Sequence, residues 1–338
     1  LALNSLGYQV NFYENDQATP LSWQRRLRGG LTTDMLFMNS RGGADEFGLV
    51  RGNVPAVDVP VLNTPVAIQF IHSYSMRAPA DRSTVAGAWL SHGAYAYIGS
   101  MAEPYLAAFV PTLQVTERLV NFVPFIISCR WWIENSPFAR PWRVSTFGDP
   151  LMLAPAPSRF EIKRITPPLD NQVDLRSQAA NLMKIAVDSN DLATYTKAIE
   201  QLVLIGEDQL AIDFWQIARQ HGAESAGSTT ILGPLFRERQ RRQFLVAWLA
   251  ASNPDALDRD MLWHLYGSEL TFETDPKIID ALAKNLRRRS RGIDLTRVAP
   301  YLARAQSKQV VRDLASAAMK NTKNKRATER YEKLLKEY

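Results

Sequence analysis

Two polar turns hold the residues of this chain whose types could support chemistry. One turn, 39–43, follows the apolar run Asp34–Met38, and the other, 72–75, follows the apolar run Val66–Ile71. A histidine beside hydroxyl groups offers the general base and the nucleophile that many hydrolases use. The candidate pocket therefore consists of Asn39, His72, Ser73 and Ser75.

The spacing of His72 and Ser73 limits what this pocket can do. Adjacent residues at a strand end point to opposite faces of the sheet, so the imidazole and the hydroxyl cannot easily bond each other. A hydrolase also needs a third group that orients the histidine, and no such group stands out. We therefore favour a hydrogen-bonded structural corner or a ligand pocket without chemistry over a catalytic site.

The first turn also suggests an anion site. Glycine turns can present free backbone amides, and arginine binds oxyanions with two parallel hydrogen bonds. The turn lacks the spacing and the lysine of a P-loop, and Gly-Gly is common in ordinary turns. An ordinary turn is thus the competing interpretation of the anion-binding candidates Arg41, Gly42, Gly43 and Arg77.

Metal and cofactor chemistry find no support in the sequence. A single cysteine, Cys129, excludes an internal disulfide and a cysteine-based zinc site. Its apolar, aromatic surroundings favour a small buried side chain over a reactive thiol. The four histidines are scattered without metal-ligand spacing. We expect no cofactor and no metal.

Strands that alternate with helices position the two turns. Val66–Ile71 and Ala94–Ile98 have the composition of buried strands, and Gly99-Ser100 that of a turn. The helix Val85–His92 between them is capped by Thr84 and ended by Gly93. Trp142–Phe147 is the last predicted strand. This alternation predicts parallel pairing with right-handed crossovers.

The segments around this core are less regular. We predict a strand at Tyr8–Tyr13, a loop with a small hairpin within Phe47–Leu62 and a helix within Glu103–Leu119, while Phe125–Trp132 fits a helix or a strand. Because Leu1–Gly7 resembles the last turns of a helix, we expect a first strand to be missing from the front of this domain. Another chain could complete the sheet instead.

A proline-rich segment divides the chain. Residues 154–174 contain four prolines and predict a linker between an α/β domain, 1–153, and an α-helical domain, 175–338. The helical domain is expected to be a solenoid or an irregular bundle. Its predicted helices are 176–188, 191–205, 208–221, 235–251, 256–266, 276–289, 295–305, 307–320 and 326–337.

Charge and hydropathy bound the possible partners. No run reaches the roughly 18 apolar residues of a membrane span. The net charge of +6 lies entirely in residues 175–338, which hold 26 Lys and Arg against 20 Asp and Glu. The clusters Arg237–Arg242 and Arg287–Arg291, with the Lys-rich tail from Lys320, suggest nucleic acid, but acidic residues are interspersed and no aromatic platform lies among the clusters. A solvated helix face or a surface that docks onto an acidic protein partner is the competing interpretation. We expect a protein partner or a larger assembly, and no nucleic acid.

Three sequence pieces share a pattern with a known family. They are DMLFMNSRGG, then PVAIQFIHSYS with STVAGAWLSHGAYAYIGSMAEPYL, and finally WRVSTFGDPLMLAP. Through them, residues 34–153 resemble the caspase-like fold of the gingipain-type cysteine peptidases. The resemblance implies a parallel sheet flanked by helices. It also implies chemistry in which a cysteine thiolate attacks a peptide carbonyl and a histidine manages the protons.

The resemblance places the family's catalytic positions on residues that cannot do this chemistry. The histidine position falls on Asn39 or Ser40, and the cysteine position falls on His72 or Ser73. We therefore expect a non-catalytic peptidase-like protein that acts as a scaffold or assembly component through its helical domain. The alternative is a hydrolase with a rearranged site around His72 and Ser73. The family and the start at Leu1 slightly favour an extracytoplasmic location.

Overall fold

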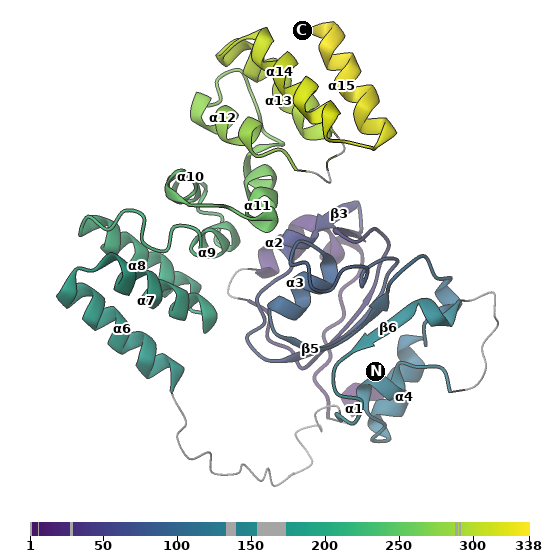
Figure 1. Cartoon of the computed structure of the whole chain (residues 1–338). Coiled ribbons are helices and arrows are strands. Elements are labelled where there is room, and N and C mark those ends of the chain that lie inside the picture. Colours follow the sequence, from purple (N-terminus) through teal and green to yellow (C-terminus); the bar gives the residue numbers. More distant parts are fainter. Residues whose placement is uncertain are drawn as a thin grey trace. The chain divides into compact units, whose positions relative to one another are not determined.

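The computed structural model describes residues 2–5, 7–27, 30–132, 140–153, 174–287, 290 and 292–338. The chain divides into two compact units, Leu1–Asp174 and Leu175–Tyr338. In Figure 1 the first unit runs from purple to blue and the second from teal to yellow. Of the predicted linker, 154–174, all but Asp174 lies outside the described residues.

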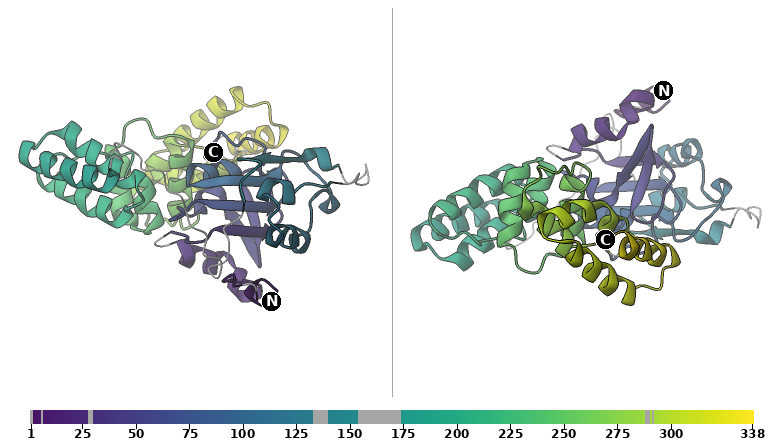
Figure 2. Two further views of the ribbon diagram at one scale, coloured as in Figure 1. Left: turned by 90° about the horizontal axis from the view of Figure 1, so that it is seen from below. Right: turned by 90° about the horizontal axis from the view of Figure 1, so that it is seen from above.

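The first unit is built on a four-stranded sheet. Its strands are β1 (Met35–Asn39), β4 (Val66–Ile71), β5 (Ala94–Ser100) and β6 (Val144–Phe147), in the order β1-β4-β5-β6. The first three strands are parallel, and β6 runs antiparallel to β5. The unit is therefore mixed α/β with a mostly parallel sheet. In Figure 2 its strands are the blue arrows that lie side by side.

Two sequence-based expectations about the sheet are wrong at β6. Parallel pairing fails there because the chain returns alongside the end of β5, where the Met101 amide donates to the Arg143 carbonyl over 2.9 Å. Gly99 and Ser100 do not form a turn. They are the last two residues of β5 and pair with residues of β6.

Side chains of β4 alternate between two apolar cores. Ile68 and Phe70 pack on one face with Trp89 of α3 (Val85–Ser91). Ala67 and Ile71 pack on the other face with residues of α4 (Thr112–Val120) and α5 (Phe125–Ser128). This alternation is the period of two expected of a strand, and because both faces are covered, all six residues of β4 are buried.

The connections differ in part from the predictions. Within Phe47–Leu62 the predicted hairpin is confirmed as β2 (Glu46–Leu49) paired with β3 (Gly52–Pro55). Tyr8–Tyr13 is irregular rather than a strand. The helix expected from Glu103 begins only at Thr112, because Pro104 and Pro111 lack the amide hydrogens that a helix interior needs. The remaining helices of this unit are α1 (Ala2–Ser5) and α2 (Pro20–Leu27), with short 3-10 turns at Asn15–Ala18, Ala56–Asp58, Leu106–Ala108 and Pro141–Arg143.

The β1 edge of the sheet, like the β6 edge, is open within the described residues. The Ser40 amide donates to the Ile71 carbonyl, and the Asp34 carbonyl accepts from the Ala67 amide. The backbone N–H and C=O groups of even-numbered residues in β1 therefore point toward β4. Those of Phe37 and Asn39 point away from the sheet. No described strand pairs with this edge. The missing first strand stays a prediction.

The second unit is entirely helical in its regular structure. Consecutive helices pack against each other along most of the chain, as in stacked helical hairpins. The predicted helix 235–251 is two helices, because Arg239 adopts a left-handed conformation with φ of 55°. The helices are α6 (Leu175–Ser189), α7 (Leu192–Leu204), α8 (Asp208–Gln220), α9 (Leu232–Arg237), α10 (Arg241–Ala250), α11 (Ala256–Tyr266), α12 (Pro276–Lys284), α13 (Ile293–Ala305), α14 (Lys308–Lys320) and α15 (Lys325–Glu337).

Among the described residues, no helix has the length and apolar character needed to cross a membrane. The same part of the chain contains no group of three or more His, Cys, Asp or Glu side chains that could hold a metal ion.

Candidate functional site

The two polar turns lie next to each other because β1 and β4 are parallel neighbours. Asn39 pairs in register with Ile71, so the turn that begins at Ser40 and the turn that begins at His72 leave the same end of the sheet. The sequence predicted this placement, since parallel strands deliver their carboxyl ends to one edge. What the turns do there depends on how each side chain is bonded.

His72 is a buried structural residue. Its ring is 2% exposed and stacks on Phe70 with 5.0 Å between the ring centroids. Its Nε2 atom lies 3.1 Å from the Glu46 carbonyl oxygen, which can only accept, so Nε2 carries the hydrogen. The lone pair is then on Nδ1, which is buried and has no hydrogen-bond partner among the described residues.

The environment of His72 keeps its ring neutral. Burial lowers the pKa of His72 from its ordinary value, because a charged imidazolium loses hydration inside the protein. The carbonyl groups of Glu46, Arg41 and Ser73 oppose this effect but are smaller causes. A neutral ring that donates to a backbone carbonyl holds the β2–β3 hairpin against the end of β4.

The two serines of the candidate pocket bond elsewhere. The Ser73 hydroxyl donates to the Glu103 carboxylate over 2.8 Å, at a position open to solvent. Ser75 is fully buried, and its Oγ accepts from the Ser100 amide over 3.4 Å. Within the described structure, no hydrogen bond joins the His72 ring to the hydroxyl of either serine. The structure therefore brings the turns together but does not pair a base with a nucleophile.

At the end of β1, one polar side chain is exposed and the next is hydrogen-bonded. Asn39 is the exposed last residue of the strand. The Ser40 hydroxyl donates to the Gly48 carbonyl over 2.7 Å, which ties this turn to the hairpin. Neither residue supplies a base where the family resemblance places the histidine.

A backbone amide of the proposed anion site already bonds to the β2–β3 hairpin. The Gly43 amide donates to the Glu46 carbonyl over 3.2 Å, and the Gly48 amide donates to the Arg41 carbonyl over 2.6 Å. Arg77 is exposed, with its guanidinium 5.7 Å from the centre of the Tyr74 ring. The expectation of two free glycine amides is wrong for Gly43. Anion binding by Arg41, Gly42 and Arg77 stays a prediction.

Gly42 has a packing reason of its own. Its φ is +147°, and a Cβ there would lie 2.5 Å from the Glu46 carbonyl oxygen and 2.8 Å from His72 Nε2. A Cβ on Gly43 would meet only Asp45 Oδ1, at 3.5 Å. The first glycine of the pair lets the hairpin approach the histidine, and the second has no such role.

Cys129 behaves as the sequence predicted. It is 3% exposed within the apolar core on the α4–α5 face. Burial raises the pKa of its thiol, so the thiolate needed for nucleophilic attack is disfavoured.

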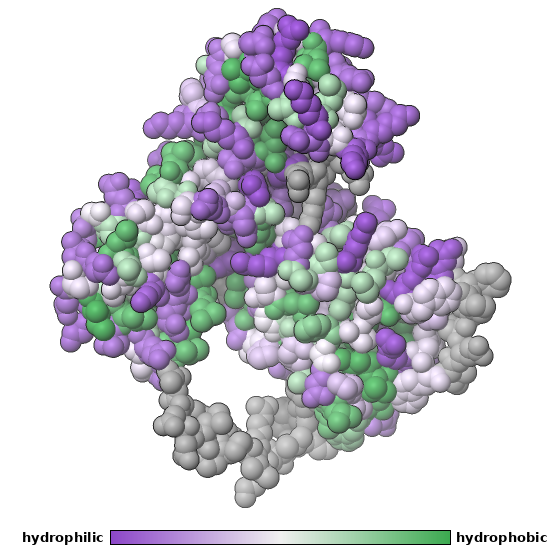
Figure 3. All heavy atoms as spheres, in the orientation of Figure 1, coloured by the Kyte–Doolittle hydropathy of each residue, from purple (hydrophilic) through white to green (hydrophobic). Residues whose placement is uncertain are grey.

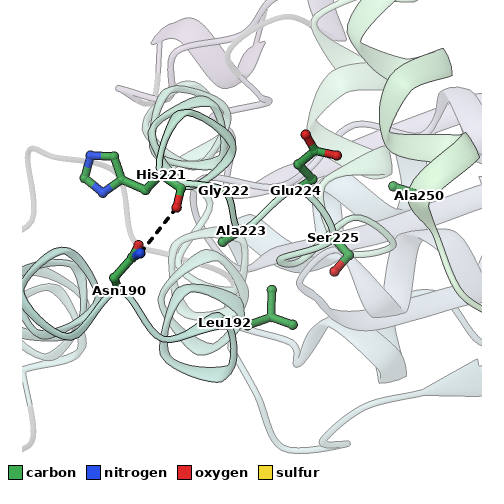
Figure 4. Close-up of a pocket in the computed structure, with 8 residues that line it drawn as sticks. All are labelled: Asn190, Leu192, His221, Gly222, Ala223, Glu224, Ser225 and Ala250. Carbon is green, nitrogen blue, oxygen red and sulfur yellow. Dashed lines mark hydrogen bonds between the residues drawn. The ribbon is translucent and has the colours of Figure 1, made fainter.

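The helical unit contains a concave region that no sequence pattern predicted. It encloses about 450 Å³ and is lined by Asn190, Leu192, residues 221–225 and Ala250. Figure 4 shows the His221 ring turned away from Glu224 and Ser225. His221 is held by the Tyr195 hydroxyl at 2.7 Å and accepts from the Asn190 amide at its carbonyl. These residues come from turns far apart in sequence, so no local pattern marks them.

Three arginines of the two basic clusters form ion pairs, and Arg288, Arg289 and Arg291 lie outside the described residues. Arg237 donates to both carboxylate oxygens of Asp208, at 2.6 and 2.7 Å. Arg241 pairs with Glu269. Arg287 donates to Asp294 through its backbone amide and its guanidinium, over 2.8 to 3.0 Å. These three arginines connect segments within the unit, and the expectation that the protein binds no nucleic acid stays a prediction.

Comparison with known proteins finds no matching family model, no matching curated protein and no matching solved structure.

Proposed function

We propose that residues 34–153 form a non-catalytic domain of the caspase/gingipain type and that the protein acts as a scaffold or assembly component through its helical unit. The proposal builds on the sequence resemblance, which puts the family's histidine at Asn39 or Ser40 and its cysteine at His72 or Ser73.

The observation that carries the proposal is the hydrogen bonding of three of these four positions. His72 donates to the Glu46 carbonyl, Ser40 donates to the Gly48 carbonyl, and Ser73 donates to the Glu103 carboxylate. Peptide hydrolysis needs a nucleophile that is hydrogen-bonded to a base. Here each polar side chain serves the hairpin or a neighbouring loop. The only thiol, Cys129, is buried in an apolar core.

The alternative remains a hydrolase with a rearranged site around His72 and Ser73. One observation favours it: the Ser73 hydroxyl donates to a carboxylate at a solvent-exposed position. A carboxylate can act as a general base. Such a site would use Glu103 in the role expected of a histidine, and His72 would only shape the turn.

Labelling with active-site reagents tests the proposal. The folded full chain is treated with a fluorophosphonate, which phosphonylates activated serines with loss of fluoride, and with an iodoacetamide probe, which alkylates reactive thiols. We expect no stoichiometric labelling of Ser73 or Cys129 in the native protein. Ser73→Ala and Glu103→Gln are the matched variants. Labelling at Ser73 that both variants abolish would establish the hydrolase alternative and end the scaffold proposal.

A further inference from the structure

The net charge of the chain lies in one short region. Residues 1–291 carry 29 Lys and Arg against 29 Asp and Glu, so this part of the chain is neutral. Residues 292–338, which form α13 to α15, carry 11 basic residues against 5 acidic ones. One of the five, Asp294, is 1% exposed and already bonded to Arg287. The outer surface of these three helices is therefore strongly positive.

The charge is densest where α14 meets α15. Residues 314–328 contain four basic side chains and no acidic one. All four are exposed, and none of them forms an ion pair within the described chain. We name this group the basic corner: Lys320, Lys323, Lys325 and Arg326.

The basic corner works against the stability of its own helix. Lys325 and Arg326 occupy the first turn of α15, which has no acidic residue. The helix dipole disfavours positive charge at this end and favours it at the other. In the same unit α8 and α11 begin with Asp208 and Asp258 in their first turns, whereas α10 begins with Arg241 and Arg242 and likewise has no acidic residue there. The Asn324 side chain caps α15 by accepting from the Ala327 amide, so the helix tolerates this charge.

We propose that the basic corner, with the adjoining surface of α13 to α15, docks an acidic surface of a protein partner. This rests on the proposed function, because it names the face through which the helical unit would join an assembly. Unpaired cations on a rigid corner steer an oppositely charged partner and fix its orientation. The visible part of this helix group in Figure 3 is mostly hydrophilic, as a charge-driven interface requires.

The chemistry of the corner favours a protein over a nucleic acid. No large apolar or aromatic side chain of α14 or α15 is among the strongly exposed ones, so the basic corner itself offers bases no platform to stack on. The exposed Phe272 ring packs on Tyr301 of α13, with 5.1 Å between the ring centroids. Glu329 and Glu332 lie one and two turns further along α15 and are exposed. They would repel the continuous phosphates of a duplex, whereas a protein surface of mixed charge can match them.

Charge reversal within the full chain provides the test. The variant carries Lys320→Glu, Lys323→Glu, Lys325→Glu and Arg326→Glu. The control carries four matched reversals at exposed positions elsewhere in the helical unit, Lys184→Glu, Lys197→Glu, Arg242→Glu and Lys277→Glu. Binding of a fluorescein-labelled peptide of twelve glutamates and of a labelled 20-base-pair DNA duplex is followed by anisotropy between 50 and 200 mM NaCl.

We expect the native chain to bind the glutamate peptide and the corner variant to bind it at least about tenfold more weakly. The control should lose about threefold or less. The corner variant should also melt about 1–4 °C higher than the native chain, because it places acidic side chains in the first turn of α15.

Three outcomes would overturn the inference: no binding of the peptide by the native chain, equal losses in variant and control, or tighter binding of the duplex than of the peptide. None of these outcomes bears on whether Ser73 or Cys129 reacts with the phosphonylating and alkylating reagents. Failure of the docking surface and failure of the non-catalytic assignment are therefore separable.

Discussion

In the α/β unit, the polar side chains at the ends of β1 and β4 bond to carbonyl groups and to one loop carboxylate, whereas in the helical unit Arg237 and Arg287 form partly buried ion pairs with carboxylates of neighbouring helices. In the α/β unit His72 donates to the Glu46 carbonyl, and in the helical unit Arg287 donates to the Asp294 carboxylate. Both arrangements resemble functional chemistry when only the residue types are considered. Their partners show that each holds two elements of the fold together.

The difference teaches how polar groups are used in the two kinds of architecture. A strand end has backbone carbonyls within reach, so a neutral side chain can satisfy them without a buried charge. Most backbone groups of a helix bond within that helix, so a polar contact between two helices needs at least one side chain, as where Arg241 bonds both the Glu269 carboxylate and the Leu265 carbonyl. Full charges in a buried place must then be matched closely, because an unmatched one is costly.

The largest effect should come from removing one partner of the buried ion pair. We expect Arg287→Ala to lower the free energy of unfolding by about 3–5 kcal/mol, because it leaves the Asp294 carboxylate buried and charged. Asp294→Ala should cost less, since the Arg287 side chain is 29% exposed and stays 3.6 Å from Asp260. Urea denaturation of the full chain measures both. Equal losses would contradict this account of the pair.

The strand-end arrangement can be tested by substituting its two adjacent glycines. Gly42→Ala should destabilise the protein by about 1–3 kcal/mol, because the new Cβ would collide with Glu46 and His72 in a left-handed backbone. Gly43→Ala, with only an ordinary contact to Asp45, should change stability by less than about 0.5 kcal/mol. Thermal unfolding of the two variants tests this difference. Similar losses of stability in both would show that His72 is not packed as described.

Acid should act on the α/β unit through His72. The pKa of His72 is lowered in the folded protein, so the unfolded chain binds more protons below the ordinary value of 6.5. Stability is thus fully present above pH 6.5 and falls on acidification, by at most about 1.4 kcal/mol per pH unit. Removing the ring in His72→Gln should flatten this part of the stability–pH curve, relative to the wild type. An unchanged curve would mean that His72 titrates normally.

The smallest effect is expected at Ser73. Its bond to Glu103 lies at the surface, where water can replace either partner. Ser73→Ala should therefore cost less than about 1 kcal/mol in the same denaturation experiment. Thr84→Ala serves as a contrast, since the Thr84 hydroxyl is buried and caps α3 by accepting from Gly87. We expect this cap to be worth more, up to about 2 kcal/mol. A larger loss at Ser73 would assign that serine a structural role beyond the turn.

Much of the fold could be predicted from local patterns. The buried strand Val66–Ile71 and the helix capped by Thr84 are confirmed, because continuous apolar runs and capping residues act over a few residues. The antiparallel direction of β6 could not be predicted, since it depends on how the chain returns after Pro141–Arg143. The break at Arg239 was also missed, because one left-handed residue does not disturb the apolar period.

The sequence predicted where the candidate site lies, but not how its side chains are hydrogen-bonded. Parallel strands put His72 and Asn39 at the same edge of the sheet, as expected. The partner of His72 is a backbone carbonyl of the β2–β3 hairpin, and every residue has a carbonyl, so no residue type could reveal it. In the same way, the Gly43 amide is taken by Glu46, which no motif encodes.

The unpaired edge of β1 affects how the molecule behaves in solution. Its residues Met35–Asn39 carry no charge and contain no proline, and the backbone groups of Phe37 and Asn39 point away from the sheet. Such an edge can recruit an extended segment of any other molecule. We therefore expect solubility at high concentration, and any tendency to form fibrils, to respond more to one lysine introduced at Asn39 than to several charges added elsewhere on this unit.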